Sequence, residues 1–398
     1  MGIYQDAGSY PLYRIKGTEE ISPFVGELAI KLGEVSLNKK ALQQIKRYGR
    51  LIGFHSVFNE IEWINPYQDI REHSKKVEFT PRKYSVNFWA DLFIDYLKNW
   101  FRNNLKQSEE YWILHSSGGD SRILSGILSK LRDEDNFKPN IKFVSWYPEA
   151  VQSEKILKHL GWEDKYIWNV GDESADNLIP ENYWNRNNYY NFDECGYLTN
   201  GEIQPFGAQQ CNFWRPYFNS VKDKNVIMML LGDVIMGGLL WLHRAKRYFV
   251  DYRIPPYSKS VKWNVIISGN ARWNGLGILG YIKYFKSLYT PTMDFNFANI
   301  GVQIPFICRY NDNVRKRIQE KLSSGLSKFE NKTGVWTSDT KDIVKTSYQD
   351  YKNSIFFKKY KLDIFHPKKR DQAIPFLSLA SLHDYLVKRD VRIRKGEL

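Results

Sequence analysis

Cysteine is scarce in this chain, and its three cysteines, Cys195, Cys211 and Cys308, are far apart in 398 residues. This spacing excludes a disulfide framework and the close pairs of a zinc site. Long apolar runs are also missing, since the longest, residues 226–231, has only the length of a strand, whereas a membrane span needs about 20 apolar residues. The first residues lack the charged and apolar regions of a signal peptide. We therefore expect a reduced, cytoplasmic protein with no membrane-spanning segment.

The bulk composition is that of a globular protein. Hydrophobic residues make up 42% of the chain, and the mean hydropathy is -0.52. This content is enough for one large domain or two modest ones. No internal repeat and no low-complexity tract interrupts the sequence.

The charge is strongly positive, with a formal net charge of +14 and a pI of about 9.3. One interpretation is a polyanionic partner such as tRNA or DNA, or ATP itself. The other is a set of solvated basic faces, which the scattering of the basic residues favours. The basic clusters are residues 243–247, 315–317, 358–361, 368–370 and 392–395.

The most informative segment is the run from Tyr111 to Arg122. The apolar residues 111–114 predict a strand, a loop of Ser and Gly follows, and an amphipathic helix is predicted from Ser121 to Leu131. A strand, a small-residue loop and a helix N-terminus together form an anion cradle, because backbone N–H groups and the helix dipole converge there. No Gly-Lys-Ser/Thr follows, so the loop is not a Walker loop.

The pattern around this run predicts an α/β fold with a parallel sheet flanked by helices. Helices predicted at 86–105 and 151–160 alternate with apolar runs of strand length, which is typical of βαβ units. The further predicted strands are 141–146, 165–170 and 225–231, and a helix is expected to begin near Gly237.

Three regions are expected along the chain. Residues 1–85 form a small N-terminal α+β region, which could be a remnant linker of a lost glutaminase domain. Residues 86–310 carry the predicted parallel sheet. Residues 311–398 are predicted to be a helical, basic C-terminal region that completes the active site.

The loop resembles the pyrophosphate loop (PP-loop), Ser-Gly-Gly-x-Asp-Ser, of ATP pyrophosphatases of the asparagine synthetase type. Ser117 stands where the family has its first glycine, and Gly119 fills the variable position. The matching residues are Ser116, Gly118, Asp120 and Ser121.

Three later segments extend the resemblance. Residues 143–161 resemble the family strand that lines the adenine pocket and the helix that follows it, ending in His-Leu-Gly. Residues 231–246 resemble the stretch Gly-x-Gly-x-Asp-Glu-x-Phe-Gly-Gly-Tyr, with Asp233 in register. The spacing from residues 342–345 to Lys361 resembles the segment that ends in the family's charge-stabilising lysine.

The resemblance implies an adenine nucleotide alpha hydrolase-like, Rossmann-like fold and an ATP-binding, AMP-forming ligase of the asparagine synthetase C-terminal-domain type. Such an enzyme adenylates a carboxylate, releases pyrophosphate and transfers the acyl group to ammonia or an amine. The substrates would be a small-molecule or peptide carboxylate and a nitrogen donor. A separate glutaminase is one source of that nitrogen, because the family's glutaminase domain is missing here.

The resemblance also implies roles for individual residues. The implied cofactors are ATP and Mg²⁺, and Mg²⁺ prefers carboxylates together with phosphate oxygens. Asp120 and Asp233 would hold the metal, with Asp233 also catalytic, while Arg122 and Lys361 would neutralise phosphate or oxyanion charge. The residues implied to bind the nucleotide are Ser116, Ser117, Gly118, Gly119, Asp120, Ser121, Val144, Ser145 and Gly232.

Two departures from the family pattern keep alternatives open. Leu230 stands where the family has an acid or Tyr, and Val234 replaces a Glu. These residues favour a non-catalytic nucleotide-binding or scaffolding protein. The positive charge and the aromatic content, with 26 Tyr, 23 Phe and 13 Trp, favour a PP-loop enzyme that modifies a nucleobase in tRNA or DNA.

Overall fold

The structure is a computed structural model. It describes residues 12–48, 51, 53, 55–64, 85–145, 149–168, 196–197, 200–202, 221–229, 232–236, 285–330, 348–362 and 376–395. Within these residues, no helix is both long enough and apolar enough to cross a membrane.

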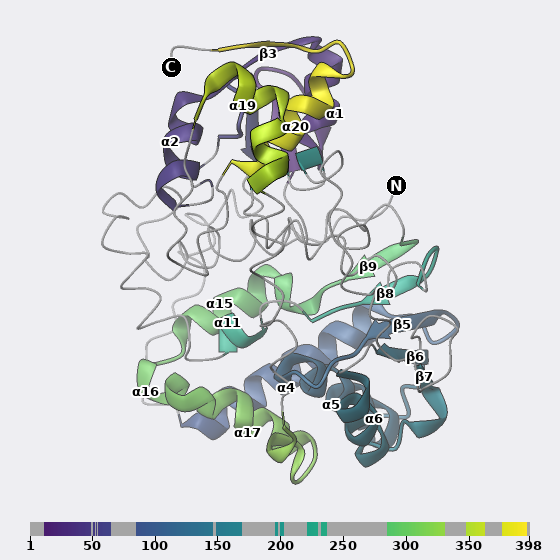
Figure 1. Cartoon of the computed structure of the whole chain (residues 1–398). Helices are drawn as coiled ribbons and strands as arrows, with labels where there is room; N and C mark the ends of the chain where they lie inside the picture. Colours follow the sequence, from purple (N-terminus) through teal and green to yellow (C-terminus); the bar gives the residue numbers. More distant parts are fainter. Residues whose placement is uncertain are drawn as a thin grey trace.

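A five-stranded sheet, with every neighbouring pair parallel, lies in the lower part of the molecule (Figure 1). Its strand order is β7-β6-β5-β8-β9. The strands are β5 Glu110–Leu114, β6 Asn140–Ser145, β7 Tyr166–Trp168, β8 Asn225–Ile227 and β9 Ser287–Tyr289. The predicted parallel sheet with flanking helices is confirmed, and β9 is a strand that the sequence analysis did not identify.

The helices beside this sheet lie in the same lower part of the molecule (Figure 1). Helix α4 ends within one residue of its prediction and begins at the predicted Val86, where the hydroxyl of Ser85 accepts the Phe88 N–H as an N-cap. Helix α17 packs on both α4 and α5. The helices are α4 Val86–Asn104, α5 Gly119–Glu134, α6 Glu149–His159, α11 Gly232–Met236, α15 Phe295–Gln303, α16 Phe306–Arg309 and α17 Asn313–Leu322.

Helices α5 and α6 each begin two residues earlier than the sequence pattern predicts, and α6 begins at Glu149 rather than at residue 151. Helix α5 begins at Gly119 rather than Ser121, because Gly118 takes the extended N-cap conformation (φ -65°, ψ 155°) and the turn closes sooner. The short helix α11, which begins at Gly232 and includes Asp233, was not predicted. The helix expected to begin near Gly237 stays a prediction. Gly237 itself lies outside the described residues.

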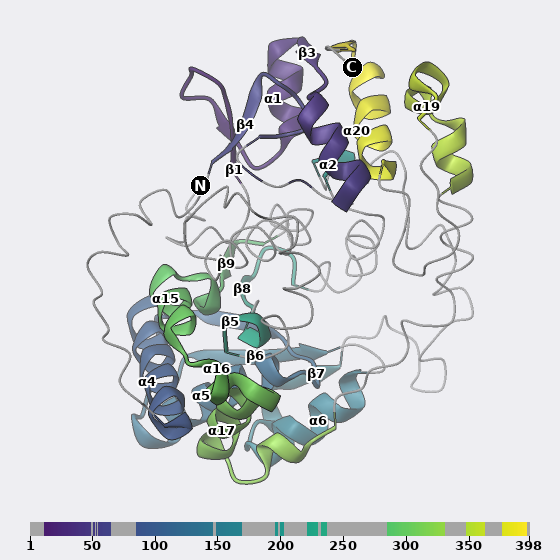
Figure 2. The same ribbon diagram turned by 90° about the vertical axis from the view of Figure 1, so that its left-hand side faces the viewer.

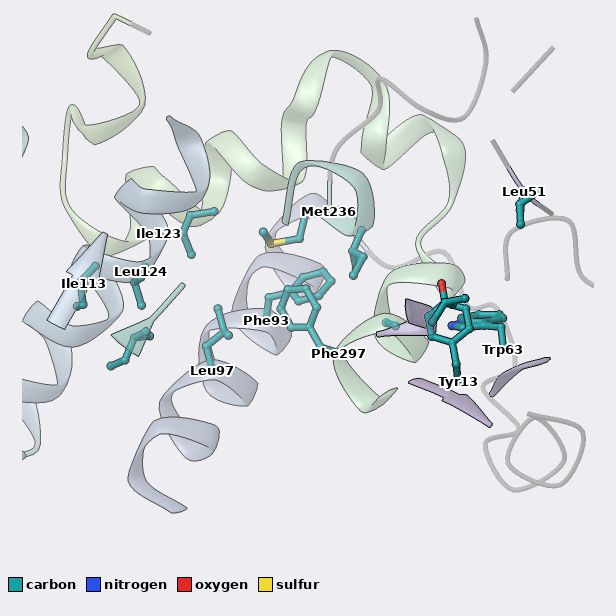
Figure 3. Packing of buried hydrophobic residues seen from close by; sticks show 14 of the residues in the cluster. Tyr13, Leu51, Trp63, Phe93, Leu97, Ile113, Ile123, Leu124, Met236 and Phe297 are labelled. Atoms are coloured by element: carbon teal, nitrogen blue, oxygen red, sulfur yellow. The ribbon is translucent and has the colours of Figure 1, made fainter. Parts of the chain in front are cut away.

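Aromatic packing joins these helices in the core. The rings of Phe93 on α4 and Phe297 on α15 have centroids 4.9 Å apart, and both side chains are fully buried. Met236, at the end of α11, is also buried and lies near this pair (Figure 3). The short helix α11 is therefore anchored by apolar contacts at its C-terminal end.

The two ends of the chain pack together in the upper part of the molecule (Figures 1 and 2). Strand β10 near the C-terminus pairs in parallel with β3 near the N-terminus, and α20 contacts α1. Tyr13 and Trp63 face each other across the antiparallel strands β1 and β4. The elements are β1 Leu12–Ile15, β2 Ile21–Ser22, α1 Val25–Leu32, β3 Glu34–Ser36, α2 Lys39–Tyr48, β4 Ile61–Ile64, α19 Ile355–Tyr360, α20 Leu377–Val387 and β10 Arg392–Arg394.

The strand order of the five-stranded sheet indicates where a ligand would bind. Numbered along the chain, the sheet runs 3-2-1-4-5, so its direction reverses between β5 and β8, which pair directly. In open α/β sheets, ligands bind at such a topological switch point, outside the carboxyl ends of the strands. At this edge β5 leads through residues 115–118 into α5, and α11 follows β8 in the chain. The starts of α5 and α11 belong to the two segments, 111–122 and 231–246, that the sequence analysis singled out.

Two buried glycines provide a test of how closely the helices pack. A Cβ on Gly301 of α15 would overlap Ile235 Cγ2 and lie 3.0 Å from the Ile235 carbonyl oxygen, whereas a Cβ on Gly126 of α5 would lie 3.1 Å from the flexible side chain of Leu322. Both substitutions to Ala gain about 1 kcal/mol of helix propensity. We predict that Gly301→Ala lowers the free energy of unfolding by about 1–3 kcal/mol through overpacking, and that Gly126→Ala changes it by less.

Guanidinium chloride unfolding of the two variants and the wild type measures this difference. Equal unfolding free energies for Gly301→Ala and Gly126→Ala would contradict the close contact between α15 and α11.

Candidate functional site

The loop between β5 and α5 is closed by its own serines. The Ser116 N–H donates to Ser121 Oγ at 3.1 Å, and the two hydroxyl oxygens are 2.9 Å apart. The Gly118 N–H donates to Ser116 Oγ at 3.2 Å. These bonds hold the loop in a tight turn over the N-terminus of the 16-residue helix α5, whose dipole favours an anion at that end.

Arg122, which the resemblance places on phosphate, is directed into the protein. Its side chain is 3% exposed, and its Nε donates to the carbonyl oxygen of Ser117 at 3.0 Å. In this arrangement Arg122 supports the loop backbone. Its contact with a phosphate remains a prediction.

The segment after β8 reaches the Asp120 carboxylate. A Cβ built on Gly232 would lie 2.5 Å from Asp120 Oδ1, 2.7 Å from Cγ and 2.8 Å from Oδ2. Only a residue without a side chain can approach so closely. The backbone at the start of α11, which continues into Asp233, therefore lies directly against Asp120.

Helix α11 is held in this position by a buried arginine. Arg309 is 1% exposed, and its Nη1 donates to the carbonyl oxygen of Ile235 at 2.7 Å. Burial lowers the pKa of Arg309 to about 9, so the guanidinium remains charged at neutral pH. A cation at the C-terminal carbonyls of α11 fixes the end of the helix opposite Gly232.

Helix α17 covers the other side of the N-terminus of α5. Gln319 is 3% exposed and its Nε2 donates to the carbonyl oxygen of Gly119 at 3.1 Å. Arg315 Nη1 lies 3.9 Å from Asp120 Oδ1, and Arg315 Nη2 donates to Asp312 at 2.7 Å. A Cβ on Gly119 would lie 3.0 Å from Gln319 Nε2 and 3.3 Å from the Arg315 guanidinium, so both side chains approach this part of α5 closely.

Val144 and Ser145 end β6 at the same edge of the sheet. Val144 is paired with Leu114, and its carbonyl oxygen accepts the His115 N–H at 2.9 Å. Both residues are fully buried. Strand β6 is therefore joined to the first residue of the loop, with Val144 and Ser145 on the β7 side of Ser116.

His115 is a buried, neutral connector beneath the loop. It is 0% exposed; its Nδ1 lies 2.5 Å from Ser153 Oγ on α6, and its Nε2 lies 3.2 Å from Ser125 Oγ on α5. Desolvation by burial lowers the pKa of the imidazole to about 3. The neutral ring can donate one hydrogen bond and accept the other, which links the two helices that follow β5 and β6.

The remaining predicted residues lie elsewhere or outside the described part. Lys361 is the left-handed C-cap of α19 (φ 53°), and α19 lies beside α20 in the upper part, away from α5 (Figures 1 and 2). The structure therefore does not bring Lys361 to the loop, and its role stays a prediction. Leu230, the Asp233 and Val234 side chains, and residues 342–345 lie outside the description.

Of the two carboxylates predicted to hold Mg²⁺, the structure describes only the side chain of Asp120. Among the described residues, no group of three or more His, Cys, Asp or Glu side chains could hold a metal ion. The predicted Mg²⁺ site uses two carboxylates and phosphate oxygens, so it needs no such group. Asp120, in the first turn of α5, lies 19% exposed at the loop, which suits a carboxylate that shares an ion with a nucleotide.

Sequence reasoning missed Arg315, Gln319 and Arg309 as site residues. Arg315 was identified only within the basic cluster 315–317, and Gln319 is 200 positions from its partner Gly119. The alternation of the two polar side chains with apolar Ile318 and Leu322 was the sole local signal. This alternation predicts an amphipathic helix, but it does not predict which part of the protein the helix packs against.

Comparison of the chain with protein-family models gives no match, and comparison with curated proteins gives none either.

The buried imidazole predicts a pH-dependent stability. Between pH 6.5 and about 3 the unfolded chain protonates His115 while the folded protein does not, so this residue lowers the free energy of unfolding by about 1.4 kcal/mol per pH unit as the pH falls through that window. We expect His115→Gln to remove this contribution. The wild type then loses stability more steeply on acidification than the variant.

Urea unfolding at pH 7.5, 6, 5 and 4.5 measures both slopes. His159→Gln is the matched control, because His159 bonds Ser323 on an exposed part of the surface. Parallel pH profiles of wild type and His115→Gln would be incompatible with the prediction.

Proposed function

We propose that this protein is an ATP-dependent carbon–nitrogen ligase that forms AMP and resembles the C-terminal domain of asparagine synthetases. It would adenylate a small-molecule or peptide carboxylate and pass the acyl group to ammonia or an amine. The observation that carries the proposal is the contact of Gly232 with the Asp120 carboxylate at the switch point of a parallel sheet. Two segments chosen for their likeness to one family meet there, although they are over 100 residues apart in sequence.

The geometry of the loop supports nucleotide binding. The triphosphate would lie over the N-terminus of α5, on the turn that Ser116 and Ser121 close, where the helix dipole favours negative charge. The base and ribose would extend towards the end of β6, where Val144 and Ser145 are joined to the loop. This path follows the carboxyl edge of the sheet, as in other open α/β sheets.

Mg²⁺ would supply charge neutralisation on the phosphates. Asp120 fits this role because its carboxylate lies at the loop, and Asp233 follows the glycine that touches it. Both residues belong to first turns of helices, where a carboxylate is stabilised by the dipole. The protein would contribute mainly by holding the reacting groups in place.

In the reaction, an oxygen of the substrate carboxylate attacks the α phosphorus of ATP, and the bond to the β phosphate breaks. Pyrophosphate leaves from the loop. The nitrogen donor then attacks the acyl carbon, the bond to AMP breaks, and the nitrogen loses a proton. Preorganised positive charge lowers the barrier of both steps.

The first test of this function is calorimetric titration with Mg²⁺ and ATP. We expect the wild type to bind, and Asp120→Ala and Asp233→Ala each to lose at least about tenfold in affinity, which is about 1.4 kcal/mol. Asp164→Ala is the control, because Asp164 is an exposed residue paired with Lys165. It should bind as the wild type does.

The result of the titration distinguishes the ligase from the non-catalytic protein and from the enzyme that modifies a nucleobase. Binding that depends on both aspartates, followed by release of AMP and pyrophosphate with a carboxylate, supports the ligase. Binding without pyrophosphate release under any substrate supports the non-catalytic protein. If the wild type does not bind ATP, the ligase proposal fails, and a titration with tRNA and DNA at low salt tests the remaining alternative.

A second prediction concerns the glycine contact. In Gly232→Ala the new methyl group would occupy the space of the Asp120 carboxylate and turn it away from the loop. We expect at least a tenfold loss of Mg²⁺-dependent ATP affinity, with a smaller change in binding without metal. Isothermal titration with and without Mg²⁺ measures both.

Gly26→Ala is the matched control for this variant. Its Cβ would lie 2.9 Å from Tyr197 Cδ2, which is also closer than real contacts allow, and this contact lies in the upper part of the molecule. We expect it to alter stability and leave the metal dependence unchanged. A Gly232→Ala protein with the metal dependence of the wild type would show that Asp120 does not hold the ion.

A further inference from the structure

Arg315 is a basic side chain brought to the loop from a distant part of the sequence. It is 15% exposed, and its guanidinium lies beside both Asp120 and the backbone of Gly119. We propose that Arg315 binds the β and γ phosphates of the nucleotide, and that it exchanges its contact with Asp120 for a phosphate oxygen when Mg²⁺ occupies that carboxylate. The inference rests on the proposed function and names a phosphate-binding residue of that site.

Arg315 is held in place from outside the loop. Its Nη2 donates to Asp312 at 2.7 Å, and Asp312 lies at a sharp entry to α17 where Asn311 and Asp312 both have positive φ (52° and 60°). Non-glycine residues seldom adopt this conformation, and consecutive ones are costly. The turn fixes Nη2 of the guanidinium through Asp312. Nη1 can therefore exchange Asp120 for another partner while the side chain keeps its position.

One face of α17 lies against the N-terminus of α5. Arg315 and Gln319 are four residues apart and so lie on the same face of the helix. Gln319 donates to the Gly119 carbonyl oxygen at 3.1 Å, which fixes the distance between the two helices. Arg315 therefore lies within reach of a ligand on the loop without any movement of α17.

The charges around the N-terminus of α5 also favour a bound polyanion. A guanidinium beside the N-terminus of a helix is unfavourable, because the helix dipole places positive charge there. In the absence of a ligand, Asp120 and Asp312 offset this charge. When a divalent cation binds the Asp120 carboxylate, that carboxylate no longer offsets the charge of Arg315. The loop then has an excess of positive charge, which a polyanion such as a triphosphate balances. Arginine suits this role because its planar fork binds phosphate oxygens in pairs.

The test uses the full-length protein and isothermal titration with ATP, pyrophosphate and AMP, each with Mg²⁺. We expect Arg315→Met to lower the affinity for ATP and for pyrophosphate by at least tenfold and to leave AMP affinity within about twofold. Arg315→Lys, which keeps a positive charge, should recover part of the loss. Arg317→Met is the matched control, because Arg317 lies on the same helix and bonds Asn87 on an exposed surface.

Three outcomes would overturn the inference, and one of them concerns the proposed function as well. If the wild type binds ATP and Arg315→Met binds it as tightly as Arg317→Met does, Arg315 does not contact phosphate. If Arg315→Met weakens ATP and AMP equally, Arg315 only supports the fold of the loop. If the wild type binds neither ATP nor pyrophosphate, the proposed function fails and this inference with it. Thermal melting of each variant verifies that it is folded.

Discussion

The site depends on one contact, the approach of the Gly232 backbone to the Asp120 carboxylate. It occurs where the strand order reverses between β5 and β8, which is the place where an open parallel sheet leaves a crevice for a ligand. The missing side chain of Gly232 leaves room for the Asp120 carboxylate between the N-termini of α5 and α11. Two such ends repel each other unless negative charge lies between them, and Asp120 supplies it. A bound polyanion would extend this balance.

Distant parts of the chain maintain the contact. Arg309 fixes the far end of α11 through the Ile235 carbonyl oxygen, and Gln319 fixes the N-terminus of α5. Both side chains are almost fully buried and donate to backbone carbonyls, so each would leave a costly unpaired group if its partner moved. The loop is thus held by α16 and α17, which follow the sheet in sequence, as much as by its own serines.

The sequence predicted the elements whose signal is local. The apolar spacing predicts α4 within one residue, and the alternation of strands and helices predicts the parallel sheet. Helix α11 was not predicted, because the apolar residues that follow Asn225 read as one long strand, whereas β8 ends at Ile227. Arg309, Arg315 and Gln319 could not be assigned, because their partners are determined by tertiary packing and lie over 70 residues away.

The amide-forming half of the proposed reaction would depend on how the chain ends pack. Lys361 ends α19, and the N-terminus of α19 is capped by Asp384 of α20, whose carboxylate accepts the Ile355 and Phe356 N–H groups at 2.8 and 3.0 Å. Lys359 in turn donates to the Ile393 carbonyl oxygen of β10, the strand that pairs with β3. A lysine at the end of α19 is therefore positioned by the N-terminal region through β3 and β10. If Lys361 has the role that the resemblance implies and the nucleotide lies over α5, the acyl group and its nitrogen donor would have to meet between the two parts of the molecule. Under the proposed function, the packing of the chain ends would then be a condition for catalysis.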